Sequence, residues 1–328
     1  MTYCNKFQGV LMALTLTCTA GLANASAPLT PHKPILIPGG AGRFDYMIVD
    51  NGMRRLYATH KGTKTLAALN LTTETVLPSA KVGGTQGDAV DAKDHALVLG
   101  GETGDCILKL NRKSLAIEKT IPTGGPVDAI TYDPKNDMVY ADHDDHPQIY
   151  VVDMKSGSLV KTVAIEGQPE FIEYDPANGM VYQNVKSTNT ILQLNTKNDK
   201  VSTFASSLPA TSPHGLAIDA KHGVLFSAGQ NGILSVYSIR THKQIATAPI
   251  AKGVDQIIFD PGTQRCYCAC KGFISVVQET RKGAKSLGDV PVPAGSHTLA
   301  VDPKTHDVWT TYLTANHSYF LRLSANLK

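Results

Sequence analysis

The chain repeats one short pattern seven times, and this repetition constrains the fold more than any other feature of the sequence. Each repeat contains a strand-like run that ends in Asp, then a turn, then an aromatic or apolar residue seven positions after the Asp. We call these residues the anchor aspartates: Asp50, Asp91, Asp133, Asp175, Asp219, Asp260 and Asp302. Their successive spacings are 41, 42, 42, 44, 41 and 42 residues. Repeats of roughly 40–45 residues built from short strands are typical of β-propeller blades.

The third repeat illustrates the expected blade. Four strand-like runs are joined by tight turns, as an antiparallel meander requires, over residues 127–132, 138–141, 148–152 and 159–165. The last repeat contains only three strands, and the apolar run 33–37 is available to supply the fourth beside residues 320–323. The sequence therefore predicts an all-β, seven-bladed β-propeller of four-stranded antiparallel blades, closed by pairing of the N-terminal and C-terminal strands.

The N-terminal segment has the pattern of a cleaved export signal. Lys6 precedes an apolar run over residues 10–23, and Ala23-Asn24-Ala25 matches a small-residue cleavage site. The run is shorter than the ~20 residues that a membrane-spanning helix needs, so no span is expected. We therefore predict a signal peptide over residues 1–25, a single propeller domain over residues 26–328, and a periplasmic location.

The composition excludes several function classes. A formal charge of +3 gives no strong field to attract nucleic acid or an anionic membrane. The chain has no G-x-S-x-G elbow, phosphate-binding loop, H-E-x-x-H helix or C-x-x-C-H haem motif.

Four cysteines follow the predicted signal: Cys106, Cys266, Cys268 and Cys270. The last three alternate along one strand, at the edge of the distance that a disulfide can bridge. Cys266 and Cys268 occupy columns that hold small or aliphatic residues in other repeats, so we expect them to be buried and unbridged. Cys270, at the end of that strand, is expected to be the most accessible of the three.

Several segments resemble the YVTN-type (YncE-like) periplasmic seven-bladed propellers. They are residues 149–153 (IYVVD), 167–171 (GQPEF), 40–46 (GAGRFDY), 213–219 (PHGLAID) and 302–306 (DPKTH), and the likeness covers the whole mature chain. The resemblance implies the fold and a binding role, with single-stranded nucleic acid as one partner class. Related lactonase-type and virginiamycin-lyase-type propellers are enzymes, but their catalytic motifs do not align with this chain, so no catalytic residue is assigned.

Two sequence columns carry the candidate site. In a propeller the inner strand of each blade begins where the second strand ends, on one face that we call the top face. We number positions from the anchor aspartate of each repeat. If the anchor pairs with the residue five positions after it, then the residue five positions before it (position −5) pairs with the residue ten positions after it (position +10). Position −5 is polar in all seven repeats: Asp45, Gln86, Asp128, Glu170, His214, Asp255 and His297. Position +10 contributes His60 and His143, so Asp45 is expected to face His60 and Asp128 to face His143.

These nine residues are the predicted ligand-binding residues. Carboxylates and imidazoles together suit a divalent transition metal, the one cofactor that the sequence suggests, but a polar organic ligand bridging the ring fits equally. A structural interpretation is also open, because such side chains often bond backbone amides. The loop 142–146 (DHDDH) is a second candidate cation site, expected to project from a single blade. Tyr46, Phe171 and Tyr312 are either core residues or a stacking platform for a flat ligand.

The function predicted from the sequence is binding of a small polar ligand, a metal or a partner at the top-face channel mouth, with no reaction assigned. One alternative is a metal-assisted lyase or lactonase that uses a top-face histidine as the base. Another is a protein–protein interaction scaffold that uses the rim loops. The expected partners are a small polar ligand or a periplasmic protein, and a monomer is expected.

Overall fold

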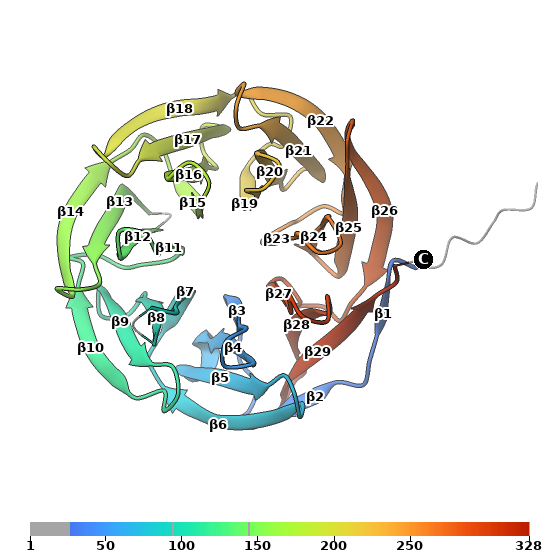
Figure 1. Cartoon of the computed structure of the whole chain (residues 1–328). Coiled ribbons are helices and arrows are strands. Elements are labelled where there is room, and N and C mark those ends of the chain that lie inside the picture. The colour runs from blue at the N-terminus through green and yellow to red at the C-terminus, as the bar shows by residue number, and fades with distance from the viewer. Residues whose placement is uncertain (1–26, 94, 144, 328) are drawn as a thin grey trace, which may run out of the picture.

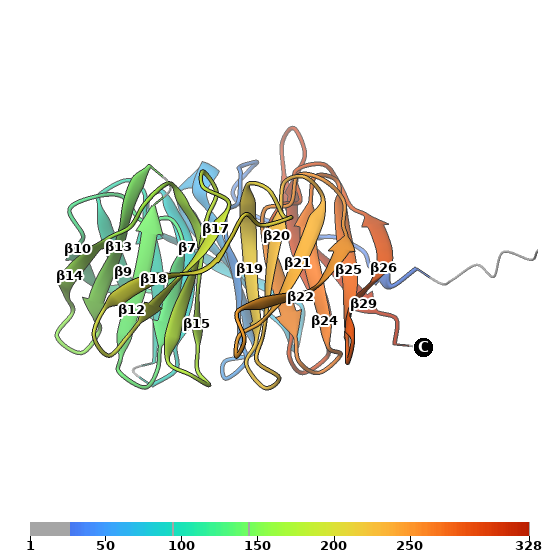
Figure 2. The ribbon, with the colours of Figure 1, turned by 90° about the horizontal axis from the view of Figure 1, so that it is seen from above.

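A computed structural model of the chain describes residues 27–93, 95–143 and 145–327, and these residues form seven antiparallel sheets arranged in a ring (Figure 1). Turned by 90°, the ring is seen edge-on as a disc (Figure 2). The predicted seven-bladed β-propeller is confirmed. A single-turn 3-10 helix, η1 (Lys61–Thr63), is the only helix among the described residues, and none of them forms a helix able to cross a membrane. The predicted signal peptide lies outside the described residues.

Each blade runs from an inner strand to an outer strand at the rim. Blade 1 holds β3 (Met47–Asp50), β4 (Arg55–His60), β5 (Thr65–Asn70) and β6 (Thr75–Lys81); blade 2 holds β7 (Thr85–Asp91), β8 (Ala96–Gly101), β9 (Cys106–Asn111) and β10 (Ile117–Pro122). Blade 3 holds β11 (Ile130–Asp133), β12 (Met138–His143), β13 (His146–Asp153) and β14 (Ser158–Ala164); blade 4 holds β15 (Pro169–Asp175), β16 (Met180–Val185), β17 (Thr190–Asn195) and β18 (Lys200–Ser206). Blade 5 holds β19 (Pro213–Asp219), β20 (Val224–Gly229), β21 (Ile233–Ser238) and β22 (Lys243–Pro249); blade 6 holds β23 (Ile257–Asp260), β24 (Arg265–Cys270), β25 (Phe273–Thr280) and β26 (Gly283–Pro291).

Blade 7 is closed by both ends of the chain. It holds β27 (Leu299–Val301), β28 (Val308–Leu313) and β29 (Ser318–Ala325), with β1 (Leu29–Pro31) and β2 (Ile35–Ile37) beside β29. Ile35 pairs with Phe320 and Leu29 pairs with Ala325, so the fourth strand is made of two short pieces. The predicted closure by residues 33–37 is confirmed, and residues 29–31 extend it (Figure 1).

The anchor aspartates build the turn between the first and second strands of every blade. In all seven turns the Asp carboxylate accepts a backbone N–H from two or three residues later, at 2.8–3.0 Å. The residue four positions after each anchor has φ between 51° and 72°, in the left-handed region. Asx turns of this kind satisfy backbone donors that the strands leave unpaired. We call the face that carries these turns the bottom face.

The core lies between neighbouring blades. The residue seven positions after each anchor is at most 2% exposed in every blade. Tyr57 of blade 1, for example, packs with Leu97 and Leu99 of blade 2, and its hydroxyl donates to the Arg112 carbonyl at 2.8 Å. Large side chains in this column therefore join adjacent blades, which explains why the seven-residue spacing holds so well.

The cysteines differ from one expectation. The four cysteines among the described residues are free, and Cys266 and Cys268 are fully buried as predicted. Cys270 is also fully buried, so the expectation that it is the most accessible is wrong. It pairs across the sheet with Phe273 and lies in the apolar cluster between blades 5 and 6, which covers this strand end.

Candidate functional site

The inner strands pair irregularly with the second strands near the top face. Three of them show a register shift near their first residue, in blades 2, 4 and 5. In blade 2, Thr85 pairs with Gly101, so position −6 rather than −5 lies opposite position +10. The extra residue of a β-bulge is left out of the ladder and its side chain is re-aimed. The −5 side chains therefore do not lie opposite the +10 side chains.

The predicted facing of Asp45 and His60 is wrong for this reason. His60 Nε2 lies 3.2 Å from the Gly42 carbonyl oxygen and 3.2 Å from Ser318 Oγ, and its ring stacks on Phe44. The side chain is 1% exposed, and burial lowers the pKa of His60 to about 4. His60 is a neutral structural residue that joins the entry to blade 1 with blade 7.

A polar cavity of about 320 Å³ lies at the channel mouth on the top face. Six of the nine predicted residues line it: Asp45, Gln86, Asp128, His143, Glu170 and Asp255. His214 and His297 contact two of these carboxylates and complete the site, whereas His60 does not. The cavity also has lining residues that the two columns did not include: Arg43, Lys61, Glu102 and Gln256.

Two of these residues share a third sequence column, position +11, which could have predicted them. Lys61 and Glu102 each stand eleven positions after an anchor, and so does Lys186. The Glu102 and Lys186 backbone N–H groups pair with the residue seven positions before their own anchor. The bulge thus brings the +11 column, one residue beyond the +10 column, to the cavity rim.

Lys61 organises one side of the cavity. Its ammonium lies 2.7 Å from Gln86 Oε1, 2.9 Å from Glu102 Oε1 and 3.8 Å from Asp45 Oδ2. Burial raises the pKa of Asp45, and the charges of Lys61 and Arg43 partly offset this. One lysine therefore holds together carboxylates and an amide from two blades.

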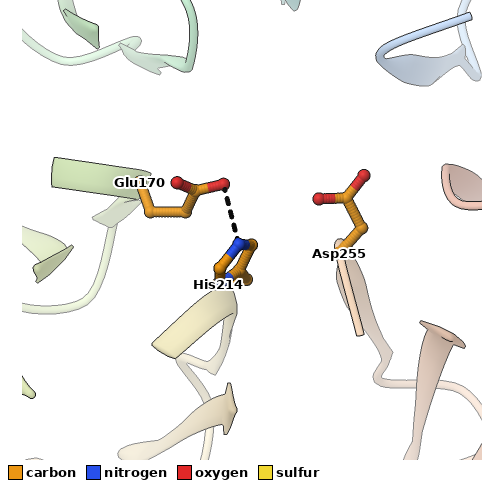
Figure 3. A group of neighbouring side chains, drawn as sticks. All are labelled: Glu170, His214 and Asp255. Atoms are coloured by element: carbon orange, nitrogen blue, oxygen red, sulfur yellow. Dashed lines mark ion pairs between the residues drawn. The ribbon is translucent and has the colours of Figure 1, made fainter. Parts of the chain in front are cut away.

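His214 occupies the opposite side, between Glu170 and Asp255 (Figure 3). One donor atom from each of these three residues lies within 4.8 Å of the others. His214 Nδ1 lies 2.9 Å from the Ser212 carbonyl oxygen, which can only accept a hydrogen bond, so Nδ1 carries the proton in the neutral ring. The lone pair of His214 is then on Nε2, 3.6 Å from Glu170 Oε1. Metal-ligating histidines are commonly oriented by a hydrogen bond from the other ring nitrogen, as Nδ1 makes here to the Ser212 carbonyl oxygen.

The two carboxylates of this group have different surroundings. Burial raises the pKa of Glu170, although His214 and Lys186, whose Nζ lies 2.6 Å from Glu170 Oε2, partly offset this. Burial alone would also raise the pKa of Asp255, but the His297 contact at 2.9 Å and the nearby histidine charges outweigh it and lower that pKa. Asp255 is therefore the more readily ionised of the two.

The loop 142–146 contributes to the same cavity. Asp142 is fully buried and its Oδ1 accepts the Ala129 N–H at 3.3 Å, so this carboxylate is structural. The Asp128 backbone pairs with Asp142, one residue before His143, and not with His143 as expected. His143 and Asp145 nevertheless line the cavity, so the loop does not simply project from one blade. Asp144 lies outside the described residues.

A second cavity of about 180 Å³, lined mostly by apolar residues, adjoins the first. Tyr46 and Phe171 line both spaces and stack at 5.8 Å, whereas Tyr312 stacks on Tyr319 and does not line the cavity. Glu173 lies in the second cavity among aliphatic residues, and burial raises the pKa of Glu173 to about 8. An ionised carboxylate is therefore less stable in this second cavity than at the channel mouth.

Comparisons with known proteins support the fold. A family model described as a repeat of unknown function (DUF6923) matches residues 113–260, which is less than half of the chain. No curated protein matches the sequence.

Two solved structures are similar over nearly the whole chain. One belongs to the "Crystal Structure of Mitotic Checkpoint Complex", with 10% identity and a TM-score of 0.76, covering 96% of this chain and 98% of that one. The other is the "Structure of U3-55K", with 9% identity and a TM-score of 0.76, covering 89% and 98%. At such identities the likeness concerns the fold alone. The chain is a β-propeller repeat protein, and its likeness to the YVTN-type propellers stays a prediction from the sequence.

Proposed function

We propose that this protein is an exported binding propeller of the YVTN type whose top-face cavity holds a divalent cation on Glu170, His214 and Asp255. A small polar ligand would complete the coordination of that cation from the cavity. The observation that carries the proposal is the fixed tautomer of His214, which presents the Nε2 lone pair between two carboxylates.

The charge of the lining supports a cation. The described lining residues include six carboxylates but only two cationic side chains, Arg43 and Lys61. Lys61 already contacts three acceptors, and the Arg43 side chain is 63% exposed. Lys186 pairs with Glu170 Oε2 from outside the lining, which leaves Glu170 Oε1 and the Asp255 carboxylate beside His214. A carboxylate–imidazole set of this kind suits Zn²⁺, Mn²⁺ or Fe²⁺.

The size and polarity of the cavity support a small ligand. A volume of 320 Å³ is at the low end of known ligand pockets, which run from roughly 300 to 1,000 Å³. Its walls come from several blades, so polar groups converge on one space. Binding without a reaction is sufficient to account for this arrangement.

Metal binding by purified protein tests the proposal. The wild-type protein, stripped with a chelator and titrated calorimetrically with Mn²⁺, is expected to bind about one equivalent at the top face. His214→Ala should remove this one equivalent from the total Mn²⁺ bound. His297→Ala removes the partner of Asp255 and should weaken it roughly 10–100-fold.

Two control variants define the outcome. His317→Ala changes an exposed histidine outside the cavity and should leave Mn²⁺ binding unchanged. Asp145→Ala changes the loop side of the cavity and should retain most of the affinity. If Asp145→Ala loses the metal while His214→Ala keeps it, the cation belongs to the loop and the proposal is wrong.

A further inference from the structure

A second cluster of potential metal ligands lies on the bottom face, at the interface of blades 5 and 6. Asp219 is the anchor aspartate of blade 5, His222 lies in the turn that follows it, and Glu279 comes from β25 of blade 6. One donor atom from each lies within 4.8 Å of the others. This group shares no residue with the top-face cavity.

The cluster differs from three other blade interfaces. At these interfaces the anchor carboxylate contacts a cationic or basic side chain of the next blade. The pairs are Asp302 with Arg54, Asp50 with Arg112, and Asp260 with His306. Asp219 instead meets the carboxyl group of Glu279 from the next blade. Two acidic groups therefore meet where three other interfaces bring opposite charges together.

His222 contacts only one of the two carboxylates. His222 Nδ1 lies 2.5 Å from Asp219 Oδ2, but Glu279 Oε2 is a buried atom with no hydrogen-bond partner among the described residues. A buried carboxylate oxygen without a partner is costly, and a bound cation would satisfy it.

An entry path exists for such a cation. The Asp219 side chain is 3% exposed whereas the His222 side chain is 42% exposed, so the cluster runs from the interior to the surface. A cavity of about 480 Å³, lined by His222, Glu279, Gln264 and Arg281, adjoins it. Water molecules or a small anionic ligand would have room to complete the coordination from this cavity.

We propose that Asp219, His222 and Glu279 form a second divalent-cation site, which joins blade 5 to blade 6. Two carboxylates and one imidazole are typical ligands of Zn²⁺ and Mn²⁺. The site replaces, with a metal, the cation-to-carboxylate contact that Arg54, Arg112 and His306 make at other interfaces. Its role is in stability of the ring, separate from ligand binding at the top face.

Titration with Zn²⁺ alone in a His214→Ala background tests the second site, because this change removes the proposed top-face ligand. The His214→Ala protein is expected to bind about one equivalent of Zn²⁺ and to melt at a higher temperature when Zn²⁺ is present. Adding His222→Ala should abolish both effects. Adding Glu279→Gln, which keeps the side-chain shape, should weaken binding at least tenfold.

A matched control uses an exposed histidine in the corresponding turn of blade 2. His95 has φ 55°, which asparagine tolerates, so His95→Asn in the same background should leave Zn²⁺ binding unchanged. Anomalous scattering from Zn²⁺-soaked crystals should place the ion between His222 and Glu279. Equal Zn²⁺ affinity with and without His222→Ala and Glu279→Gln, or an ion located elsewhere, would overturn the proposal.

Discussion

Ile37 provides a sharp test of ring closure, because it lies in a strand with a matched control next to it. Ile37 is 1% exposed and packs in a cluster with Met47 of blade 1 and with Trp309 and Phe320 of blade 7. Truncation of a buried Ile to Ala costs about 2–5 kcal/mol of the free energy of unfolding. That is a large share of the roughly 5–15 kcal/mol that holds a typical domain folded. Leu36, its neighbour, is 48% exposed, and Leu36→Ala should change the free energy by less than about 0.5 kcal/mol.

Equilibrium unfolding in urea, followed by tryptophan fluorescence, measures both variants. With a slope near 3 kcal/mol per molar urea, Ile37→Ala should lower the midpoint by roughly 1 M and leave the slope unchanged. The single tryptophan, Trp309, packs in the same cluster and therefore reports on the closing interface. Equal midpoints for Ile37→Ala and the wild type, or equal losses for Ile37→Ala and Leu36→Ala, would refute a closure that depends on the buried face of β2.

Two further predictions concern buried groups. None of the cysteines at positions 106, 266, 268 and 270 should react promptly with an alkylating reagent in the native protein. Cys106, at 7% exposure, should react first. Rapid labelling of Cys266 would contradict the packing described. Burial raises the pKa of Glu173 from 4.5 to about 8, so the folded state binds the proton more tightly than the unfolded state and stability should fall as pH rises from about 5 to 8. Glu173→Gln should flatten the profile measured by urea unfolding, and an unchanged profile would contradict the raised pKa of this carboxyl group.

The sequence predicted the fold well because the relevant signal is local and repeated. Each anchor aspartate forms its turn with residues two to four positions away, and the same chemistry recurs in every blade. The closing strand was also predictable, since the last repeat has one strand too few and residues 33–37 offer one. These features depend on spacing along the chain and need no knowledge of side-chain conformation.

The site was predicted less completely because the decisive feature is a bulge. The −5 column correctly identified residues at the channel mouth, but one additional residue in the inner strand changed which side chains meet. His60 was misplaced for this reason, and Lys61, one position later, was missed. The bottom-face group of Asp219, His222 and Glu279 joins two blades by side-chain reach, which no periodic pattern encodes.

The split fourth strand of blade 7 has a consequence for the order in which the ring folds. Ile35 must find Phe320, a partner that lies beyond six complete blades of the chain. Joining residues so distant costs about 5 kcal/mol of chain entropy, and contacts of this kind are slow to form. Until residues 318–325 pair, the partly folded array presents unpaired strand edges at both ends, the kind of surface that recruits chaperones or neighbouring chains. The first strands of the chain are thus among the last to acquire their partners.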